Sequence, residues 1–168
     1  MQRWRGVVYR AHHPKWAYDA LSGEGARLFG GRFNARGTRA LYTALTPEGA
    51  WAEGQQGFAF KAQPMTTCAY RVDCEHVLDL STSVACAAAQ VDFSDLSIAW
   101  EDLAAQRLPV QTWLLQRHLI AQSVSAIIVP SFAPAAPLGA CNMVFWKWDA
   151  ILPHKVELVD DFGRLERG

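Results

Sequence analysis

Short apolar runs alternate along the chain with polar stretches rich in glycine and proline. Seven of these runs have the length and the β-branched or aromatic content that strands favour, and they cover residues 6–10, 39–44, 66–72, 77–80, 125–131, 142–148 and 155–159. No Gly-x-Gly-x-x-Gly motif follows a strand, so the pattern does not support a Rossmann domain. The pattern instead predicts an α+β domain with a mixed, mainly antiparallel sheet of six or seven strands.

Two helices have recognisable beginnings. Thr46 is a favourable N-cap and Pro47 a favourable first helical residue, so a helix is predicted from there through Glu53 to about residue 56. Pro109 opens a second helix, whose positions at helical spacing are Thr112, Leu115, Leu119 and Gln122.

The other segments between strands have weaker patterns. Residues 12–37 are rich in Gly, Pro and Arg, and they are predicted to form a long, ordered loop with a short helix at 16–20. Residues 82–107 are predicted to be helical in part. Their acidic side chains are assigned to a solvated face, and these are Asp92, Asp95, Glu101 and Asp102.

Composition limits the range of functions. The 168 residues are 51% hydrophobic, which suits a single domain over 1–168 that buries its own core. The formal net charge is zero, which argues against a strong general attraction to nucleic acid or membranes. Residues 1–39 nevertheless hold eight basic and two acidic residues, a local charge of +6. We interpret this segment as a site for a small phosphate-bearing ligand, with a solvated surface or a nucleic-acid site as alternatives.

The cysteines and the start of the chain point to a reduced, cytoplasmic protein. The four cysteines form no Cys-x-x-Cys pair, and a domain with this apolar content does not need disulfides. The run Cys74-Glu75-His76 is not matched elsewhere by a second group of ligands, so no metal is expected. No signal-like segment opens the chain and no apolar run approaches membrane-spanning length.

Candidate chemistry gathers around the run Gly30-Gly31-Arg32-Phe33-Asn34. The two glycines let the backbone approach a ligand, and Arg32 offers a planar cation suited to phosphate. Tyr42 lies in the next strand-like run, and Glu53 lies on the helix that follows it. Cleavage of a nucleotide's glycosidic bond needs a cation for the phosphates, an aromatic face for the base and a carboxylate beside the positive charge that develops on the ribose. All three residue types are present in this region.

With Val129-Pro130-Ser131 and the later Asn142 added, these motifs resemble those of the RES-domain toxins of bacterial toxin–antitoxin modules. That family is named after an arginine, a glutamate and a serine, which here match Arg32, Glu53 and Ser131. Phe33 departs from the tryptophan that the motif usually contains. The resemblance implies a fold like that of NAD-dependent ADP-ribosyltransferases, NAD as co-substrate and a helix-turn-helix antitoxin as partner.

Our hypothesis for the site follows from this resemblance. Arg32, helped by Arg10, would bind the pyrophosphate, and Tyr42 would stack on the nicotinamide or its ribose. Glu53 would hydrogen-bond the ribose hydroxyls and stabilise the oxocarbenium-like charge. Neutral hydrogen bonds from two further residues would orient the ribose or the carboxamide, namely Ser131 and Asn142. No metal is required.

The acceptor of the ADP-ribose is left open by the residues. Segment 12–25 looks most like the branch that modifies proteins, which favours transfer to a protein; the alternative is an NAD glycohydrolase or phosphorylase that depletes the cofactor. A further alternative is a non-catalytic nucleotide or nucleic-acid binding module. For the toxin we expect no membrane partner, no direct contact with nucleic acid, and an antitoxin that occludes the site with an acidic segment.

Overall fold

The chain folds around one six-stranded sheet. The computed structural model describes residues 1–55 and 64–165. Its strands are β1 (Gln2–His12), β2 (Leu41–Ala44), β3 (Thr66–Asp79), β4 (Ala126–Pro130), β5 (Cys141–Phe145) and β6 (His154–Leu158). Its helices are η1 (Pro14–Asp19), α1 (Glu24–Phe29), α2 (Pro47–Gly54), α3 (Ser83–Ala88), η3 (Phe93–Ser97), α4 (Trp100–Ala105) and α5 (Gln111–Ala121).

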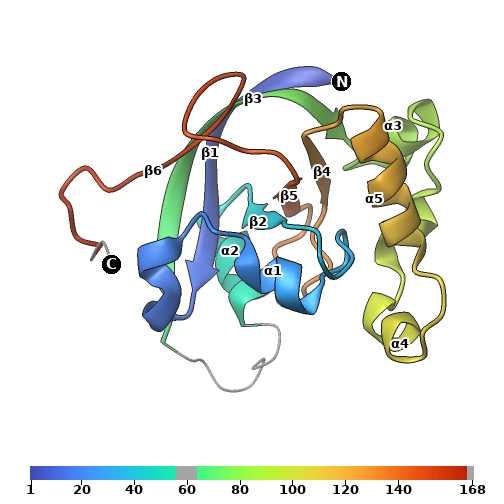
Figure 1. Cartoon of the computed structure of the whole chain (residues 1–168), viewed down its shortest axis with the longest axis horizontal. Coiled ribbons are helices and arrows are strands. Elements are labelled where there is room, and N and C mark those ends of the chain that lie inside the picture. The colour runs from blue at the N-terminus through green and yellow to red at the C-terminus, as the bar shows by residue number, and fades with distance from the viewer. Residues whose placement is uncertain (56–63, 166–168) are drawn as a thin grey trace.

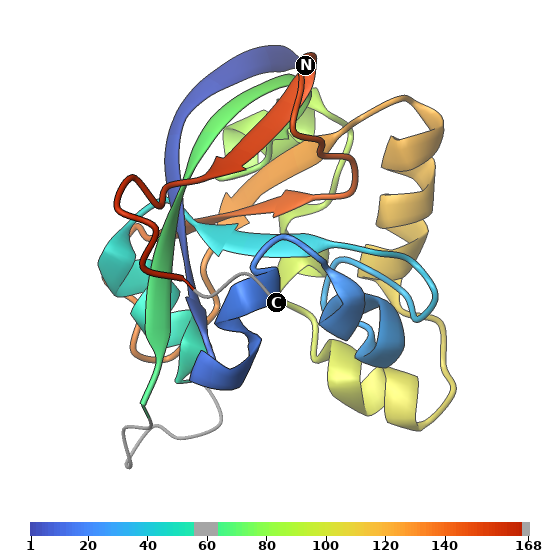
Figure 2. The same cartoon turned by 60° about the vertical axis from the view of Figure 1, so that its left-hand side comes forward.

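The sheet is mixed and closes on itself. The strand order is β1-β2-β5-β4-β3-β6, and β1 also pairs with β3, so five strands form a ring. Among the described strands only β3 and β4 run parallel, and the other pairs are antiparallel. Figure 2 shows the long strands β1 and β3 curving together around the molecule. The predicted α+β class with a mainly antiparallel sheet is confirmed.

Strand β4 carries apolar side chains on both of its faces. Ala126 and Ile128 point into one hydrophobic cluster, which lies inside the curled sheet. Tyr70 and Phe145 belong to the same cluster. Ile127 and the residue two positions on, Val129, point into a second cluster. Since successive side chains of a strand face opposite sides, a strand between two cores reads as a continuous apolar run rather than an alternating one.

The second cluster lies between the sheet and the helices that follow β3. It contains side chains from α3, η3 and α5, namely Cys86, Leu96 and Leu119. Figure 1 shows α3, α4 and α5 together on one side of the sheet, away from β6. This second layer carries residues 92–105 to the neighbourhood of the loop that contains Arg32.

The sequence was wrong about a break in β3. Two strands were predicted, at 66–72 and 77–80, but one strand runs from Thr66 to Asp79. His76 has a positive φ of 60°, and β3 has one residue more than β1 between paired positions there, which marks a β-bulge. The polar residues before Val77 therefore bend the strand without ending it.

The helix beginning at Thr46 is confirmed in detail. The Thr46 hydroxyl accepts a hydrogen bond from the Gly49 N–H at 3.1 Å, and Pro47 is the first helical residue. The helix ends at Gly54, with Gln55 as its C-cap, and residue 56 lies outside the described residues. The helix predicted after Pro109 is α5, which begins at Gln111.

Other predicted bounds need correction. The helix predicted at 16–20 is a 3-10 helix at Pro14–Asp19, and the long loop also contains α1, which was not predicted. The strand predicted at 142–148 ends at Phe145, because Trp146 and Trp148 leave the sheet and donate their indole N–H groups to loop carbonyls. In the described residues no helix is both long and apolar enough to cross a membrane.

Candidate active site

A cavity of about 380 Å³ opens where β1, β2 and β5 meet α2 and the loop after α1. Its volume lies in the range of small-molecule sites. Five of the six residues that the sequence assigned to a site line it: Arg10, Arg32, Tyr42, Glu53 and Asn142. These residues come from four different secondary-structure elements and one loop, so the fold gathers them.

Glu53 is the centre of a short hydrogen-bond network. Its Oε1 accepts a hydrogen bond from the Ser131 hydroxyl at 2.6 Å and another from the Asn142 Nδ2 at 2.6 Å. Ser131 directly follows β4, and Asn142 lies on β5, where it pairs with Val129. The two neighbouring strands thus hold the carboxylate of helix α2 in one orientation.

The strand end that carries Ser131 is itself fixed. Its backbone N–H donates to the Ala140 carbonyl at 2.8 Å, and its hydroxyl accepts from the Ala133 N–H at 3.3 Å. Ser131 contacts Glu53 but is not part of the described cavity wall. Its geometry therefore suits positioning of the carboxylate. The Asn142 Oδ1 is buried and has no hydrogen-bond partner among the described residues.

Arg32 is half-buried and already occupied on one side. Its Nη1 donates to the Ile98 and Leu96 carbonyls, and its guanidinium lies 4.7 Å from the centre of the Phe132 ring. Burial lowers the pKa of Arg32 from its ordinary value, and the nearby Glu53 carboxylate opposes that shift. The group remains a cation, because an arginine pKa is so high.

Arg10 provides a second cation in the same cavity. Its Nη1 donates to the Ala20 carbonyl at 3.4 Å, a long hydrogen bond. Burial lowers the pKa of Arg10 as well. Two half-buried guanidinium groups beside a carboxylate form an electrostatic arrangement that suits a ligand with more than one negative charge.

The Tyr42 hydroxyl supports the loop that carries Arg32. It donates to the Asn34 Oδ1 at 2.7 Å and accepts from the Phe33 N–H at 2.9 Å. Burial raises the pKa of Tyr42 above its ordinary value. Tyr42 lines the cavity, and its hydroxyl is engaged in these two hydrogen bonds.

This close contact explains Gly31. A Cβ built on Gly31 would lie 2.5 Å from the Tyr42 hydroxyl and 2.7 Å from the Asn34 Oδ1, so no other residue fits without displacement. Gly30 has a φ of +76°, which other residues rarely adopt. The two glycines serve the tight loop and its packing on Tyr42.

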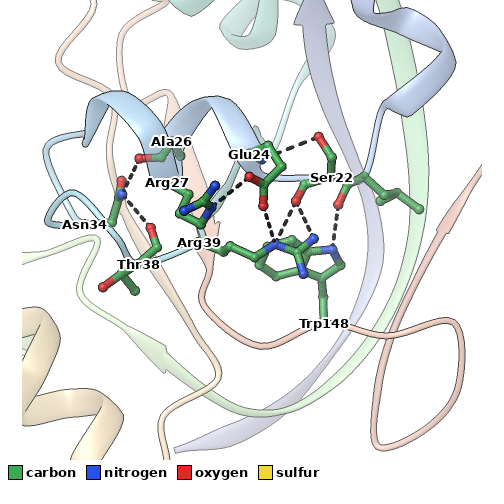
Figure 3. Close-up of polar contacts among 9 residues, drawn as sticks. Ser22, Glu24, Ala26, Arg27, Asn34, Thr38, Arg39 and Trp148 are labelled. Carbon is green, nitrogen blue, oxygen red and sulfur yellow. Dashed lines mark hydrogen bonds and ion pairs between the residues drawn. The ribbon is translucent and has the colours of Figure 1, made fainter.

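The same loop is also held by polar contacts of its own Asn34 and of two indole groups that the sequence did not single out. Asn34 is fully buried, and its Nδ2 donates to the Ala26 carbonyl at 2.8 Å and to the Thr38 carbonyl at 2.9 Å (Figure 3). Indole N–H groups donate to two more loop carbonyls, from Trp113 to Gly31 and from Trp146 to Phe33, each at 2.8 Å. Arg32 is thus presented by a rigid loop.

Four of the eight basic residues in 1–39 form ion pairs with acidic side chains. Figure 3 shows Glu24 between Arg27 and Arg39, at 2.7 Å and 3.6 Å. Arg3 and Arg5 both contact Asp73, at 2.6 Å and 3.1 Å. Of the arginines that the structure describes, those that line the cavity are Arg10 and Arg32. Ion pairs therefore neutralise part of the local charge of +6, and two of its cations lie at the cavity.

Three further residues of the cavity wall were missed as site residues: Trp100, Glu101 and Phe132. The sequence assigned Glu101 to a solvated face, and the side chain is indeed exposed, but it stands at the cavity. Trp100 begins α4, and Phe132 directly follows the Val129-Pro130-Ser131 motif without being part of it. Their contribution depends on long-range packing, which no local pattern reveals.

The described cysteines are not arranged for redox or metal chemistry. All four cysteines are free, and burial raises the pKa of Cys74 to about 12, far from that of a reactive thiol. Within residues 1–55 and 64–165, His, Cys, Asp and Glu side chains do not gather in a group of three or more that could hold a metal ion.

The family model for the RES domain matches residues 7–162, a span that contains every residue of the cavity network. The chain belongs to the RES-domain family. Among solved structures, it is similar to a chain in the crystal structure of the MbcT–MbcA toxin–antitoxin complex from M. tuberculosis. The identity is 22%, the alignment covers 95% of this chain and 84% of that one, and the TM-score is 0.66. This likeness supports the RES-domain fold described above.

No curated protein matches the chain. The RES-domain match therefore identifies the family, and the details of the site come from its geometry.

Proposed function

We propose that this RES-domain protein is the toxin of a toxin–antitoxin pair, and that it cleaves NAD at the bond between nicotinamide and ribose and transfers the ADP-ribose to a protein. The observation that carries the proposal is the fixed carboxylate of Glu53, which faces a cavity that also contains Arg10 and Arg32. A preorganised anion beside two cations fits a substrate whose reacting ribose is attached to a pyrophosphate.

Each residue has a role in this reaction. Arg32 binds the pyrophosphate on the side of its guanidinium that does not face the Leu96 and Ile98 carbonyls. The Tyr42 ring supports the nicotinamide or its ribose. As nicotinamide departs, positive charge develops on the ribose, and the Glu53 carboxylate stabilises it.

Ser131 and Asn142 act through Glu53. The sequence suggested that they orient the ribose or the carboxamide, whereas in the structure both donate to the Glu53 Oε1. We assign them to positioning of the carboxylate, because an anion whose donors are already in place needs no reorganisation during the reaction.

A second candidate keeps the cavity and changes the acceptor. Arg10 makes only a 3.4 Å hydrogen bond to a carbonyl in the described structure, and it lines the same cavity as Glu53. It therefore suits a small anion such as phosphate, which would make the protein an NAD phosphorylase, and water as acceptor would make it a glycohydrolase. The non-catalytic nucleic-acid module has less support, because the arginines that could form a binding face are paired with Asp73 and Glu24.

The partner in this proposal is an antitoxin that covers the cavity. The similar chain of known structure was crystallised in a toxin–antitoxin complex. For this chain, a covering segment with acidic side chains or a terminal carboxylate complements Arg10 and Arg32. A cytoplasmic site of action follows from the use of NAD.

The test is an incubation of the purified chain with NAD, with and without cell extract, and with and without phosphate. Mass spectrometry of the products separates the acceptors. We expect nicotinamide release, with ADP-ribose mass added to a protein of the extract. Free ADP-ribose or its 1-phosphate would instead identify the second candidate, and no nicotinamide release under any condition would contradict the proposed reaction.

A further inference from the structure

Two residues of the cavity wall have no role in the proposed reaction as described so far. Trp100 and Glu101, the first two residues of α4, line the cavity together with Arg32 and Glu53. The carboxylates of Glu53 and Glu101 both act electrostatically on the Arg32 guanidinium. Arg32 therefore interacts with two acidic groups of the cavity wall, one in the network of α2 and one on α4.

The position of α4 is fixed by contacts with the Arg32 loop. The Arg32 Nη1 donates to the Leu96 and Ile98 carbonyls, which immediately precede this helix. The Trp100 ring packs against the Trp113 ring with centroids 6.3 Å apart, and the Trp113 indole in turn donates to the Gly31 carbonyl. The position of the Trp100 ring is thus fixed by its contact with Trp113, and Trp100 lies on a helix and not in a loop.

From this arrangement we infer that Trp100 and Glu101 form the subsite for the adenosine half of the dinucleotide, and that Glu101 makes the protein select NAD over NADP. This inference rests on the proposed function. A dinucleotide has two nucleosides on opposite sides of its pyrophosphate. With the pyrophosphate at Arg32 and the reacting ribose at Glu53, the adenosine lies on the other side of Arg32, toward α4.

The chemistry of the two residues suits that half of the substrate. A braced indole offers a stacking face for adenine. A carboxylate next to it accepts hydrogen bonds from the 2′- and 3′-hydroxyls of the adenosine ribose, as acidic residues do in other dinucleotide sites. The same carboxylate repels a 2′-phosphate, which carries up to two negative charges. Among the described residues that line the cavity, the cation that interacts with Glu101 is Arg32, which serves the pyrophosphate and does not offset this repulsion.

The test measures binding, so it does not depend on turnover. The purified full chain is titrated by calorimetry with ADP-ribose, with ADP-ribose 2′-phosphate and with nicotinamide mononucleotide, which lacks the adenosine. We expect ADP-ribose to bind at least roughly tenfold more tightly than its 2′-phosphate. Equal affinity for these two ligands, or no measurable binding of either, overturns the inference.

Two variants locate the effect. Glu101→Gln should bring the two affinities to within about threefold of each other, because it removes the repelling charge and keeps the side-chain shape. Trp100→Leu should weaken ADP-ribose binding by roughly tenfold through loss of stacking. Neither variant should change the affinity for nicotinamide mononucleotide. The matched control is Asp102→Asn, since Asp102 is an exposed acidic neighbour on α4 outside the described cavity wall.

Some outcomes separate this inference from the proposed reaction. If Glu101→Gln and Asp102→Asn have the same effect, Glu101 is not the selecting group and the inference is wrong. If Trp100→Leu weakens nicotinamide mononucleotide and ADP-ribose equally, the substrate lies in the opposite direction and the inference is again wrong. If the binding pattern holds but no nicotinamide is released from NAD, the adenosine subsite is supported and the proposed reaction fails.

Discussion

The hydroxyl of Ser131 donates to the Oε1 of Glu53 across 2.6 Å, although the two residues are 78 positions apart in the chain. One lies just after the buried strand β4 and the other in the last turn of α2. The contact joins the glutamate and the serine of the family's motif into one group with Asn142. In the proposed reaction, the role of the serine is to hold the carboxylate in place before the substrate arrives.

Replacement of Arg32 by lysine keeps a positive charge and loses the planar fork. We expect Arg32→Lys to lower the affinity for NAD by roughly tenfold, as measured by calorimetry, because a bidentate pair with the pyrophosphate is lost. Arg36→Lys is the control, since Arg36 is exposed and donates to the Phe29 carbonyl outside the described cavity wall. Unchanged NAD binding by Arg32→Lys would limit Arg32 to holding the Leu96 and Ile98 carbonyls.

Addition of a single methyl group to the loop tests its packing. Gly31→Ala should lower the free energy of unfolding by about 1–3 kcal/mol, because its Cβ would overlap the Tyr42 hydroxyl. Gly25→Ala is the control, since nothing lies within 4 Å of its Cβ, and it should change stability by no more than about 1 kcal/mol. Denaturant unfolding compares the two variants. Equal stability would mean that the loop can move away from Tyr42 at little cost.

The buried His12 predicts a dependence of stability on pH. Its Nε2 lies 2.7 Å from the Tyr70 hydroxyl, and burial, reinforced by the nearby Arg10 cation, lowers its pKa to about 4. The unfolded chain binds this proton near the ordinary pKa of 6.5, and the folded chain does not. His12 therefore favours the folded state above pH 6.5, and that contribution, up to about 3 kcal/mol, is lost as the pH falls from 6.5 to 4.

The measurement is the free energy of unfolding at several pH values. His12→Gln should flatten the decline between pH 6.5 and 4, whereas the exposed His118→Gln should leave it unchanged. A residual slope should remain, because burial also lowers the pKa of His154. An identical decline in wild type and His12→Gln would mean that the imidazole of His12 is not the group responsible.

The charge of the cavity predicts how an antitoxin inhibits. A covering segment that is acidic or ends in a carboxylate pairs with Arg10 and Arg32, whereas a basic segment is repelled there. We therefore expect the purified toxin–antitoxin complex to bind NAD at least roughly tenfold more weakly than the toxin alone. If the complex binds NAD as tightly as the free toxin, inhibition does not act by occlusion.

Local signals in the sequence were sufficient for part of the fold. The N-cap Thr46 with Pro47 predicted the beginning of α2, and the apolar run at 125–131 predicted β4, since both depend on neighbouring residues. The continuity of β3 was not predicted, because a bulge at His76 depends on pairing with β1, which is remote in sequence.

The candidate site was likewise predicted only in part from the sequence. Motif order placed Arg32, Tyr42 and Glu53 in one region, and the cavity contains all three. The sequence did not reveal the hydrogen-bond partners of these side chains. It did not show that Ser131 donates to Glu53, or that the Tyr42 hydroxyl accepts from the loop that carries Arg32. The indoles that hold the loop lie about 80 or more positions away from it, and such contacts have no local pattern.

The role of Glu53 is the central claim, and the most direct measurement is the rate of nicotinamide release from NAD by wild type, Glu53→Gln and Glu48→Gln. Glu48 is the matched control, because it is an exposed glutamate in the first turn of the same helix. Glutamine preserves the shape of the Glu53 side chain and removes the charge that stabilises the ribose cation. We predict that Glu53→Gln releases nicotinamide about 100-fold more slowly or worse, while Glu48→Gln matches wild type. Release by Glu53→Gln within tenfold of wild type would contradict the assignment of Glu53 as the carboxylate on which the reaction depends.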